Sequence, residues 1–294
     1  MSNLVIGASG LVGYEFYRQT TELKDWNYTY HNVQIKDFIK LDALNTEELN
    51  KLFSKLSPRN VIVPAAMPDV NKCEKEPELS YTNNVGLIKN VLDSMKKYSG
   101  KKIIFFSTDY LFDGKDGPYS EDAPPVPLNV YGRHKLECEK EIISSGFDYL
   151  IIRTTGIFGW EKQRKNFMYR VIDTLTRGEE LVVPNDQFAN PTYIKDLVCA
   201  TLFLLNHNHS GVFNVAGPEV MEREALARKI ARFYKLNEKL VRGEPTSYFK
   251  SIAIRPLNSG LKINKILKLG IKMRSVEDTL KDMQEKKAEE DRYE

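Results

Sequence analysis

The chain has 294 residues, enough to bury a large core as one big domain or as two intertwined ones. Apolar residues make up 41% and aromatic residues 11%, which is ordinary for a soluble enzyme and excludes a disordered chain. The 43 basic and 40 acidic residues nearly balance, which argues against a dedicated nucleic-acid binder because such proteins usually carry a strong basic excess.

The first half of the chain alternates short β-like runs with helical patterns. In chain order the pattern predicts strand Leu4–Ile6, helix Val12–Thr21, strand Asn27–Val33, helix Thr46–Leu56, strand Asn60–Ala65, helix Glu78–Tyr98, strand Lys102–Ser107, helix Val130–Ser144 and strand Tyr149–Thr154. Asn45 or Thr46 is the expected N-cap of the second helix. Strands separated by helices predict βαβ units, and therefore an α/β fold with a doubly wound parallel sheet of the Rossmann type.

The second half is less regular, with expected helices at Asn166–Thr176, Ile194–Leu205 and Arg223–Tyr234. We expect a dinucleotide-binding domain formed by residues 1–160 with a return segment at 191–210. A smaller C-terminal substrate-binding lobe would comprise residues 161–190 and 211–294, ending in a solvated helix and tail.

Cysteine and histidine usage suggests no structural metal site and no disulfides. Cys73, Cys138 and Cys199 form no C-x-x-C pair, and the four histidines form no ligand pattern. We expect no metal, although a magnesium ion held by carboxylates stays open. The first strand begins near residue 3, which leaves no room for a signal peptide, and no apolar run reaches transmembrane length. These features predict a cytoplasmic enzyme without membrane association.

A glycine-rich turn follows the first expected strand and opens the first expected helix. Gly7, Gly10 and Gly13 have the spacing Gly-x-x-Gly-x-x-Gly rather than Gly-x-Gly-x-x-Gly. Glycines there permit a tight turn, a close approach to a pyrophosphate and close helix-on-strand packing, while the helix N-terminus offers free N–H groups to phosphates. A dinucleotide would therefore contact Gly7, Ser9, Gly10, Leu11, Val12 and Gly13. A purely structural glycine turn is the competing interpretation.

The end of the second expected strand bears on the choice between NADH and NADPH. The acidic residue that usually binds the ribose 2′-hydroxyl, about twenty residues after the glycines, is missing. The segment there is Tyr30-His31-Asn32-Val33, which would place Asn32 beside the cofactor. Because no carboxylate would repel a 2′-phosphate, the sequence favours NADPH and leaves NADH open.

Tyr131 and Lys135 form a candidate proton-transfer pair. Four residues apart on a helix, their side chains lie on one face. A free tyrosine titrates near ~10, too high for easy proton transfer at neutral pH. A neighbouring ammonium favours the phenolate, so we expect Lys135 to lower the pKa of Tyr131 toward working pH.

These motifs resemble the extended short-chain dehydrogenase/reductase superfamily and, within it, the dTDP-4-dehydrorhamnose reductase family. The resemblance covers nearly all residues. It rests on the segments Gly7–Gly13, Ser107–Gly114, Tyr131–Lys135, Asn185–Tyr193 and Arg255–Ser259. It implies reduction of a 4-keto-6-deoxy nucleotide sugar, most simply dTDP-4-dehydrorhamnose, by NADPH.

The resemblance also implies roles for individual residues. Thr108 would hold the substrate carbonyl oxygen, Tyr131 would donate a proton to it, and Lys135 would lower the tyrosine pKa and hold the nicotinamide ribose. The cofactor contacts implied are Asp42 at adenine, Ala65, Ala66 and Met67 after the third strand, and Asn84 as a structural or relay residue. The substrate contacts implied are Thr108, Asp109, Tyr110, Asn190, Thr192 and Arg255. Helix capping competes as an explanation for Asp42 and Asn84, and a surface salt bridge competes for Arg255.

Two residues depart from the family pattern as we know it. Gly156 stands where these reductases usually carry a tryptophan, and Pro64 stands where they tend to carry asparagine. The first change removes a large contact face from the expected sugar-binding surface. Neither change touches Thr108, Tyr131 or Lys135.

Other functions stay open at this point. The regulatory β subunit of methionine adenosyltransferase resembles the same family and also lacks that tryptophan, so a cofactor-binding protein without turnover is one alternative. A nucleotide-sugar epimerase is another. A dehydratase is disfavoured because Asp109 is followed by Tyr110, where those enzymes carry a second acid. The exact sugar stays open, and a homodimer is compatible with the sequence.

Overall fold

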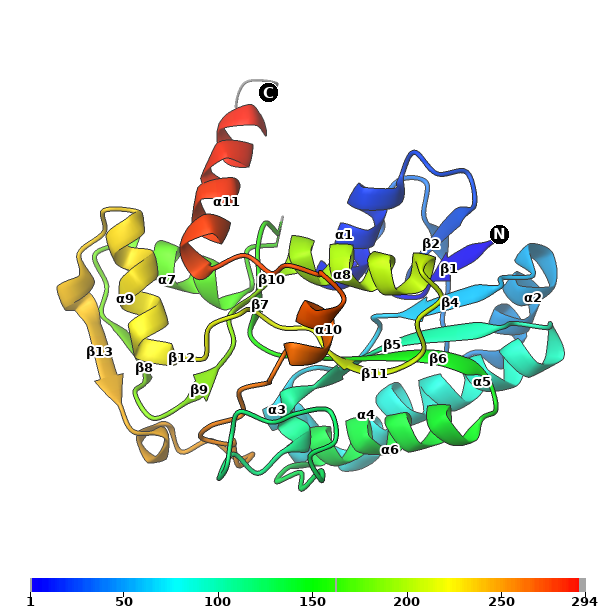
Figure 1. Ribbon diagram of the computed structural model, residues 1–294, viewed down its shortest axis with the longest axis horizontal. Helices are drawn as coiled ribbons and strands as arrows, with labels where there is room; N and C mark the ends of the chain where they lie inside the picture. Colours follow the sequence, from blue (N-terminus) through cyan, green and yellow to red (C-terminus); the bar gives the residue numbers. More distant parts are fainter. Residues whose placement is uncertain (1, 162, 291–294) are drawn as a thin grey trace.

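Across residues 2–161 and 163–290, which the computed structural model describes, the central feature is a seven-stranded parallel sheet (Figure 1). The spatial order of its strands is β11-β6-β5-β4-β1-β2-β3. Their bounds are β1 Asn3–Val5, β2 Trp26–Tyr30, β3 Ile39–Lys40, β4 Asn60–Val63, β5 Lys102–Thr108, β6 Asp148–Thr154 and β11 Gly211–Asn214. The order reverses between β1 and β4, which is where sheets of this type open a crevice for ligands. The expected doubly wound α/β fold is confirmed.

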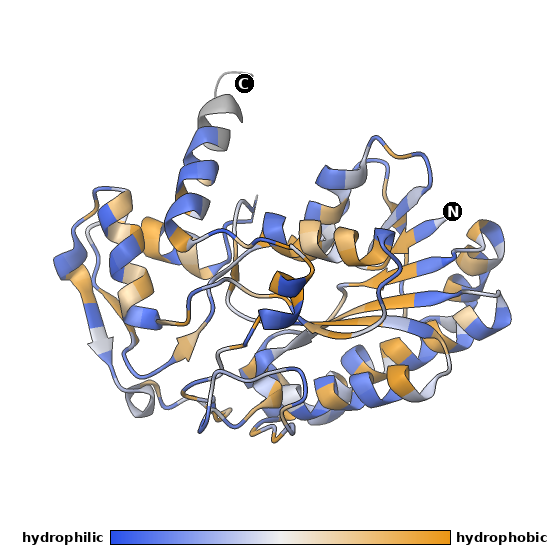
Figure 2. Cartoon of the chain, in the orientation of Figure 1, coloured by the Kyte–Doolittle hydropathy of each residue, from blue (hydrophilic) through white to orange (hydrophobic). Residues whose placement is uncertain are grey.

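Helices cover both faces of the sheet. In Figure 1, α1 (Leu11–Thr20) and α8 (Ile194–Asn206) lie on one side, and α2 (Thr46–Leu56), α5 (Leu87–Lys97) and α6 (Val130–Ser144) lie on the other. Successive residues of β5 point to opposite faces of the sheet. Ile103 and Phe105 pack in the hydrophobic cluster on the side of α2, α5 and α6, and Ile104 and Phe106 pack in the cluster on the side of α1 and α8. All seven residues of β5 are buried, as expected of a central parallel strand. Figure 2 shows the resulting concentration of apolar residues on the strands.

Helices α2 and α6 have the bounds predicted from the sequence, and Asn45 caps α2 by accepting hydrogen bonds from the N–H groups of Glu47 and Glu48. The expected helix Glu78–Tyr98 is instead α4 (Pro77–Tyr81), a π-helical turn (Thr82–Gly86) and α5. The sequence analysis missed α3 (Val70–Lys75), a short helix capped by Asp69. It also extended the second strand too far, because the chain leaves the sheet after Tyr30.

A smaller lobe follows the sheet along the chain. Its elements are α7 (Phe167–Thr176), β8 (Leu181–Pro184), β9 (Phe188–Ala189), β12 (Met221–Glu222), α9 (Arg223–Phe233) and β13 (Val241–Glu244), with short helical turns at Glu238–Leu240 and Thr246–Phe249. β8 pairs with β13 in parallel, and β9 pairs with β12 antiparallel. β11 follows the segment 191–210, which we expected to return to the dinucleotide-binding domain, and it pairs with β6 as the edge strand of the main sheet.

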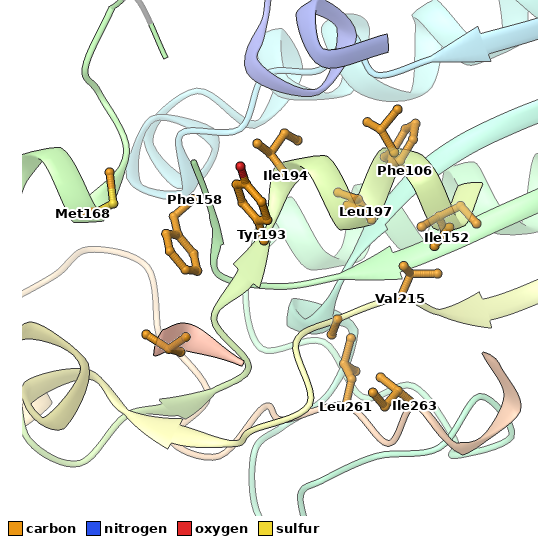
Figure 3. Close-up of a cluster of buried hydrophobic side chains, with 14 of the residues drawn as sticks. Phe106, Ile152, Phe158, Met168, Tyr193, Ile194, Leu197, Val215, Leu261 and Ile263 are labelled. Atoms are coloured by element: carbon orange, nitrogen blue, oxygen red, sulfur yellow. The ribbon is translucent and has the colours of Figure 1, made fainter. Parts of the chain in front are cut away.

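One hydrophobic cluster joins the sheet to this lobe (Figure 3). It includes Phe106 and Ile152 from the sheet, Leu197 from α8 and Met168 from α7. The short pair β7 (Ile157–Phe158) and β10 (Thr192–Tyr193) lies between the two parts, and Phe158 is almost completely buried there. Fully burying a side chain of this size contributes roughly 1.5–3 kcal/mol to the free energy of unfolding, so the sheet and the lobe stabilise one another.

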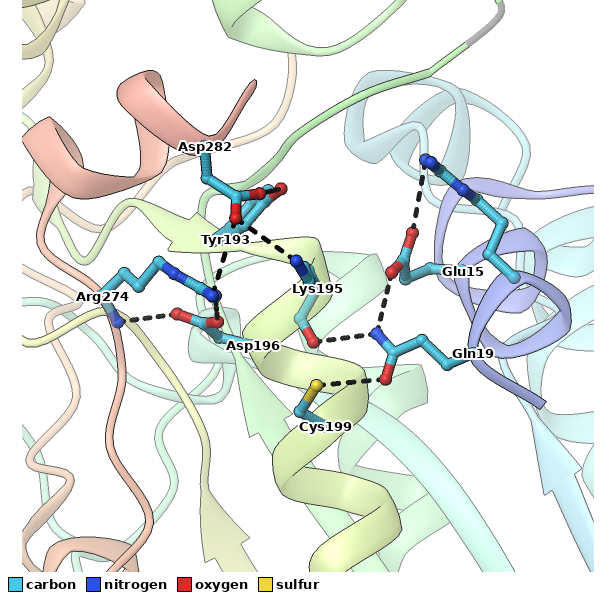
Figure 4. A network of polar contacts seen from close by, with 9 residues as sticks. Glu15, Gln19, Tyr193, Lys195, Asp196, Cys199, Arg274 and Asp282 are labelled. Atoms are coloured by element: carbon cyan, nitrogen blue, oxygen red, sulfur yellow. Dashed lines mark hydrogen bonds and ion pairs between the residues drawn. The ribbon is translucent and has the colours of Figure 1, made fainter. Parts of the chain in front are cut away.

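The C-terminal segments return to the sheet. Helix α10 (Asn264–Lys268) packs near β11, and α11 (Val276–Glu290) is tied to the start of α8 by a polar network (Figure 4). Asp282 of α11 accepts a hydrogen bond of 2.6 Å from Tyr193 and pairs with Lys195 at 3.3 Å. Arg274 pairs with Asp196. Among the described residues, no helix is long and apolar enough to cross a membrane.

A buried ion pair fastens α6 to the sheet. Arg153 of β6 donates to both carboxylate oxygens of Glu139, at 3.0 and 2.7 Å, and its remaining guanidinium nitrogen donates to the carbonyl of Glu121 at 2.9 Å. The two side chains are only 7% and 2% exposed. This bidentate geometry fixes the helix relative to the carboxyl end of the strand.

Glu139→Gln should lower the free energy of unfolding by about 3–5 kcal/mol, because it leaves the Arg153 guanidinium buried without its counter-charge. Glu141→Gln, on the exposed face of the same helix, removes a surface pair with Lys89 and should cost less than about 1 kcal/mol. Urea unfolding of both variants measures the difference. Equal losses for the two variants would contradict the structural role given to the buried pair.

Candidate functional site

A cleft of about 620 Å³ opens at the carboxyl ends of the strands, at the switch point between β1 and β4. The expected cofactor residues that border it are Gly7, Ser9, Gly10, Leu11, Val12, Gly13, Asn32, Asp42, Ala65, Ala66, Tyr131 and Lys135. Met67 and Asn84 do not border it. Segments separated by more than a hundred residues thus meet at one cavity.

The three glycines of the turn differ in what requires them. Gly7 has φ +90°, and a Cβ there would lie 2.7 Å from the Cβ of Ala65. A Cβ on Gly13 would lie 2.5 Å from both the Cα of Ala8 and the carbonyl oxygen of Gly7. Gly10 is different, since its Cβ would meet only the Gly7 carbonyl oxygen, at 3.6 Å. The fold therefore requires Gly7 and Gly13, whereas the absence of a side chain at Gly10 serves the cleft.

The N-terminus of α1 is suited to an anion. Gly10 is its N-cap residue and provides no side-chain hydrogen bond, and the first turn contains no acidic residue. The free N–H groups and the positive end of the helix dipole therefore face the cleft without a competing carboxylate. This arrangement fits the pyrophosphate of a dinucleotide.

The part of the cleft that follows β2 is lined by Tyr30, His31, Asn32 and Val33, with no carboxylate among these four. Asp42 borders the cleft, and its carboxylate also accepts a hydrogen bond of 2.9 Å from the N–H of Leu44. It therefore stabilises the turn before α2, while the cap of α2 itself is Asn45.

Asn84 does not border the cleft but supports a segment that does. Lying in the π-helical turn and 3% exposed, it accepts a hydrogen bond of 3.0 Å from the N–H of Met67 and donates to the hydroxyl of Ser80 at 3.2 Å. It thereby fixes the segment after β4, in which Ala65 and Ala66 border the cleft. The capping explanation is not needed for Asn84, since its side chain bonds Met67 outside its own helix.

Tyr131 and Lys135 border the cleft, whereas Thr108 borders an adjoining cavity together with Tyr131. Thr108 is the last residue of β5, and Tyr131 and Lys135 lie in the first turns of α6, whose N-cap Asn129 accepts from the N–H of Gly132 at 2.9 Å. The Nζ atom of Lys135 donates to the carbonyl of Phe106 at 2.7 Å and lies 5.9 Å from the centre of the Tyr131 ring.

The pKa of Tyr131 is raised, chiefly by burial and then by the negative charge of Asp109. Our expectation of a lowered pKa is therefore wrong for the structure as it stands. The reason is that both groups of the pair are desolvated: burial also lowers the pKa of Lys135, from 10.5 to about 8. The phenol is consequently protonated at neutral pH, the state required of a proton donor.

Two buried hydroxyls at this end of the cleft have no hydrogen-bond partner among the described residues. They are the Oγ of Ser107 and the Oγ1 of Thr154, on the neighbouring strands β5 and β6. Both residues border the cleft. Since buried polar atoms are normally paired, these hydroxyls fit a ligand that carries hydrogen-bonding groups. Together with the space at Gly10, they match a dinucleotide cofactor.

A second cavity of about 260 Å³ begins where the first ends. Thr108, Asp109, Tyr110 and Tyr131 border it, and Tyr131 borders both cavities. Asp109 is buried, accepts hydrogen bonds from Ser259 and from Thr108, and has a raised pKa because of its burial. A ligand in the second cavity and a ligand in the cleft would therefore meet at Tyr131.

Gly156, where we noted the missing tryptophan, borders this second cavity with φ +56°. A Cβ would lie 2.8 Å from the carbonyl oxygen of Asn190, so any side chain would require the backbone to move. Pro64 borders the cleft at the switch point between β1 and β4.

Three of the expected substrate residues lie outside the second cavity. Asn190 is 1% exposed, and its amide bonds the backbone of Gly217 and Leu261. Thr192 is fully buried and bonds the backbone of Asn190 and Gly217. Both therefore hold the lobe's backbone in place. Arg255 lies beside the cavity, hydrogen-bonded to Tyr110 and to Asn71 at 3.3 Å, and forms no ion pair with any described residue.

The sequence analysis missed further residues that border the two cavities, among them Gln163, Thr155, Gln187, Arg223 and Ser259. A signal for Arg223 did exist: it is the first residue of α9, where the helix dipole disfavours a cation. The part of the chain that the structure describes contains no group of three or more His, Cys, Asp or Glu residues arranged to hold a metal ion.

Known proteins resemble this chain over almost its whole length. The family model described as RmlD substrate binding domain matches residues 1–288. The spore coat polysaccharide biosynthesis protein SpsK of Bacillus subtilis is 30% identical over 281 residues, covering 95% of each chain. The methionine adenosyltransferase 2 subunit beta of Rattus norvegicus is 27% identical over 291 residues, covering 92% of this chain and 83% of that protein. The dTDP-4-dehydrorhamnose reductase of Bacillus anthracis, solved in complex with NADP, matches with a TM-score of 0.88 and 26% identity over 97% of this chain and 100% of that chain.

The glycine turn yields a paired prediction. Gly10→Ala should leave the free energy of unfolding within about 1 kcal/mol, because φ −83° suits alanine and the Cβ has room. It should weaken NADPH binding about tenfold or more, as a methyl group at a close contact costs about 1–3 kcal/mol. Gly13→Ala should instead lower stability by about 1–3 kcal/mol. Urea unfolding and NADPH fluorescence titration test both, and full cofactor affinity in Gly10→Ala would contradict the assignment.

Lys135 yields a prediction on the pH dependence of stability. Between pH 8 and 10.5 the unfolded chain binds a proton that the native state has lost, so burial of Lys135 costs most at low pH and least above pH 10.5. Lys135→Met should therefore raise the free energy of unfolding by about 1–3 kcal/mol at pH 7 and by less than about 1 kcal/mol at pH 10. Lys140→Met, exposed on the same helix, should change it by less than about 0.5 kcal/mol at either pH. A gain from Lys135→Met that grew with pH would refute this.

Proposed function

Because the chain belongs to the RmlD substrate binding domain family, whose members include NAD(P)-dependent nucleotide-sugar reductases, we propose that it reduces the 4-keto group of a 6-deoxy nucleotide sugar. The proposed substrate is dTDP-4-dehydrorhamnose and the proposed product dTDP-L-rhamnose. The observation that carries the proposal is the position of Tyr131, which borders both the cofactor cleft and the second cavity. A proton donor at that junction can reach a carbonyl group presented to the cofactor.

The residues at the junction support distinct steps. NADPH supplies the hydride when bound. The hydroxyl of Thr108 donates to the carboxylate of Asp109 in this structure, and in the proposed reaction it turns to donate to the carbonyl oxygen of the bound substrate. Tyr131 donates the proton to that oxygen as negative charge develops on it. Burial raises the pKa of Tyr131 and so keeps the phenol protonated until an alkoxide, a much stronger base, forms beside it.

Lys135 acts on the cofactor side of the same junction. Its ammonium is held by the Phe106 carbonyl, and we propose that it binds the hydroxyls of the nicotinamide ribose. Its lowered pKa, about 8, places the loss of this charge just above neutral pH. Cofactor binding should then weaken as the pH rises through 8.

NADPH is the proposed cofactor. The lining after β2 contains no carboxylate among Tyr30, His31, Asn32 and Val33 that would repel a 2′-phosphate, and Lys36 lies nearby at the adjoining pocket. The reductase of Bacillus anthracis was solved in complex with NADP. NADH stays as the alternative cofactor.

A regulatory protein is the alternative function. It is favoured by the similarity to the methionine adenosyltransferase 2 subunit beta and by Gly156, which leaves the second cavity without a large apolar wall at that point. An intact Tyr131 and Lys135 are compatible with either function, so turnover decides between them.

The proposal is tested by NADPH oxidation with enzymatically generated dTDP-4-dehydrorhamnose. The wild type should turn over, and Tyr131→Phe should lose about 10²–10⁴-fold in kcat because a positioned proton donor contributes about that factor. NADPH affinity should persist in the variant, since only the hydroxyl is removed.

Tyr81→Phe is the matched control. Tyr81 packs edge-on against His134 on the exposed side of α6 and borders neither cavity. The kcat of the Tyr81→Phe variant should therefore equal that of the wild type. Cofactor binding by the wild type without any turnover would reject the reductase and favour the regulatory alternative. Full activity in Tyr131→Phe would reject the assigned proton donor.

A further inference from the structure

Arg223 presents a guanidinium to the second cavity without a counter-charge. It borders that cavity together with Thr108 and Tyr131. Its guanidinium carbon lies 4.3 Å from the centre of the Phe167 ring, so the group is stacked on α7. Among the side chains that the structure describes, those of residues 2–161 and 163–285, no carboxylate forms an ion pair with Arg223. The hydrogen bond that Arg223 donates is that of its backbone N–H to the carbonyl of Gln187.

The surroundings of Arg223 disfavour a cation. Burial is the largest influence on its guanidinium and lowers its pKa, and the charges of Arg170 and Arg255 act in the same direction. Its position at the start of α9 adds the positive end of a helix dipole. Asp109 and Tyr110 act in its favour, but the carboxylate of Asp109 is already engaged by hydroxyl donors from Ser259 and Thr108. Arg223 is half-buried, and a partly desolvated charge without an ion partner is costly, of which stacking on one aromatic ring offsets only part.

The charges around the cavity indicate which anion would pair with Arg223. Arg255 hydrogen-bonds Tyr110 at the edge of the same cavity, and Arg223 and Arg255 are close enough to influence each other electrostatically. A single carboxylate would compensate only one of these cations. A diphosphate brings two negative charges, and its oxygens match the planar fork of guanidinium donors.

We propose that Arg223 binds the diphosphate of the nucleotide sugar and thereby determines which ligands enter the second cavity. The inference rests on the proposed function for the nature of the substrate, and it assigns to the chain a specificity-determining residue on α9. Anchoring the diphosphate at Arg223 while the sugar carbonyl lies at Tyr131 orients the sugar along the cavity. Free sugars, which lack this anchor, should bind far more weakly.

The experiment is a calorimetric titration of the NADP-loaded protein with dTDP and with UDP, which share the diphosphate. Arg223→Met keeps an unbranched stem over Phe167 and removes the charge, and it should weaken dTDP binding about 10- to 100-fold, as expected for the loss of charge-assisted hydrogen bonds. Arg223→Lys should recover part of the affinity, because it restores the charge without the fork. The wild-type affinity should also fall with rising salt.

Arg232→Met is the matched control. Arg232 lies on the exposed side of the same helix, paired with Glu238 at the surface, so the variant loses the same charge away from the cavity. Its dTDP affinity should stay within about twofold of the wild type, since exposed pairs contribute little. NADPH affinity should be unchanged in all three variants, which verifies that each is folded.

Unchanged dTDP affinity in Arg223→Met would overturn the inference. The inference would also be overturned if Arg223 were needed to bind glucuronate, a sugar carboxylate without a diphosphate, but not to bind dTDP. Because dTDP binding requires no turnover, the inference and the proposed function fail separately. Arg223-dependent dTDP binding without reduction of the keto sugar would contradict the reductase and support the inference. Turnover with the same KM in Arg223→Met would contradict the inference alone.

Discussion

The fastening of α6 to the sheet is the constraint on which the candidate site depends. Tyr131 and Lys135 belong to the helix, whereas Thr108 and the two unpaired hydroxyls belong to the strands β5 and β6. The bidentate contact between Glu139 of the helix and Arg153 of β6 holds these two groups of residues at a fixed distance from each other. At the other end of the helix, Asn129 caps the first turn and also donates to the carbonyl of Ile254 at 2.8 Å, which brings the lobe's segment to the same place. The junction of the two cavities is therefore defined by buried polar contacts within the scaffold.

Desolvation dominates the electrostatics at this junction. Tyr131, Asp109 and Lys135 all have pKa values displaced toward the neutral form, and burial is the largest cause for each. The pair Tyr131 and Lys135 thus does not resemble a simple ammonium–phenolate pair in water. Charged forms cost more at such a site than in water, so a ligand that brings complementary charge is bound more strongly there. Arg223 keeps its charge in these surroundings, since a guanidinium stays protonated even where its charge is disfavoured.

Much of this arrangement could be predicted from the sequence, where local patterns determine structure. Asn45 and the amphipathic pattern of Thr46–Leu56 specify a helix without help from distant residues, and the glycine turn specifies the cleft. The edge strand β11 was missed because Gly211–Asn214 is short and becomes a strand only by pairing with β6. The π-helical turn at Thr82–Gly86 depends likewise on the bonds of Asn84 to Met67 and Ser80, from segments that a helical pattern does not describe.

The sequence was least informative about where polar side chains point. Asn190 and Thr192 stand in a segment that resembles a substrate-binding block, yet the tertiary structure directs them to backbone groups. Arg223 stands in an ordinary amphipathic helix, yet the folded chain turns it to the cavity. Only the packing of the lobe against the sheet determines that Asn190 and Thr192 face the backbone and that Arg223 faces the cavity.

The hydrophobic cluster that runs from the sheet into the lobe also bears on motion. Domains that close over a ligand by rotating about a hinge usually meet across a polar interface that separates easily. Here Phe158, Met168 and Leu197 belong to one continuous apolar interior, so a rotation would expose surface that water solvates poorly. The sheet and the lobe should therefore lose their structure in a single cooperative transition, and they should keep their relative orientation when a ligand binds.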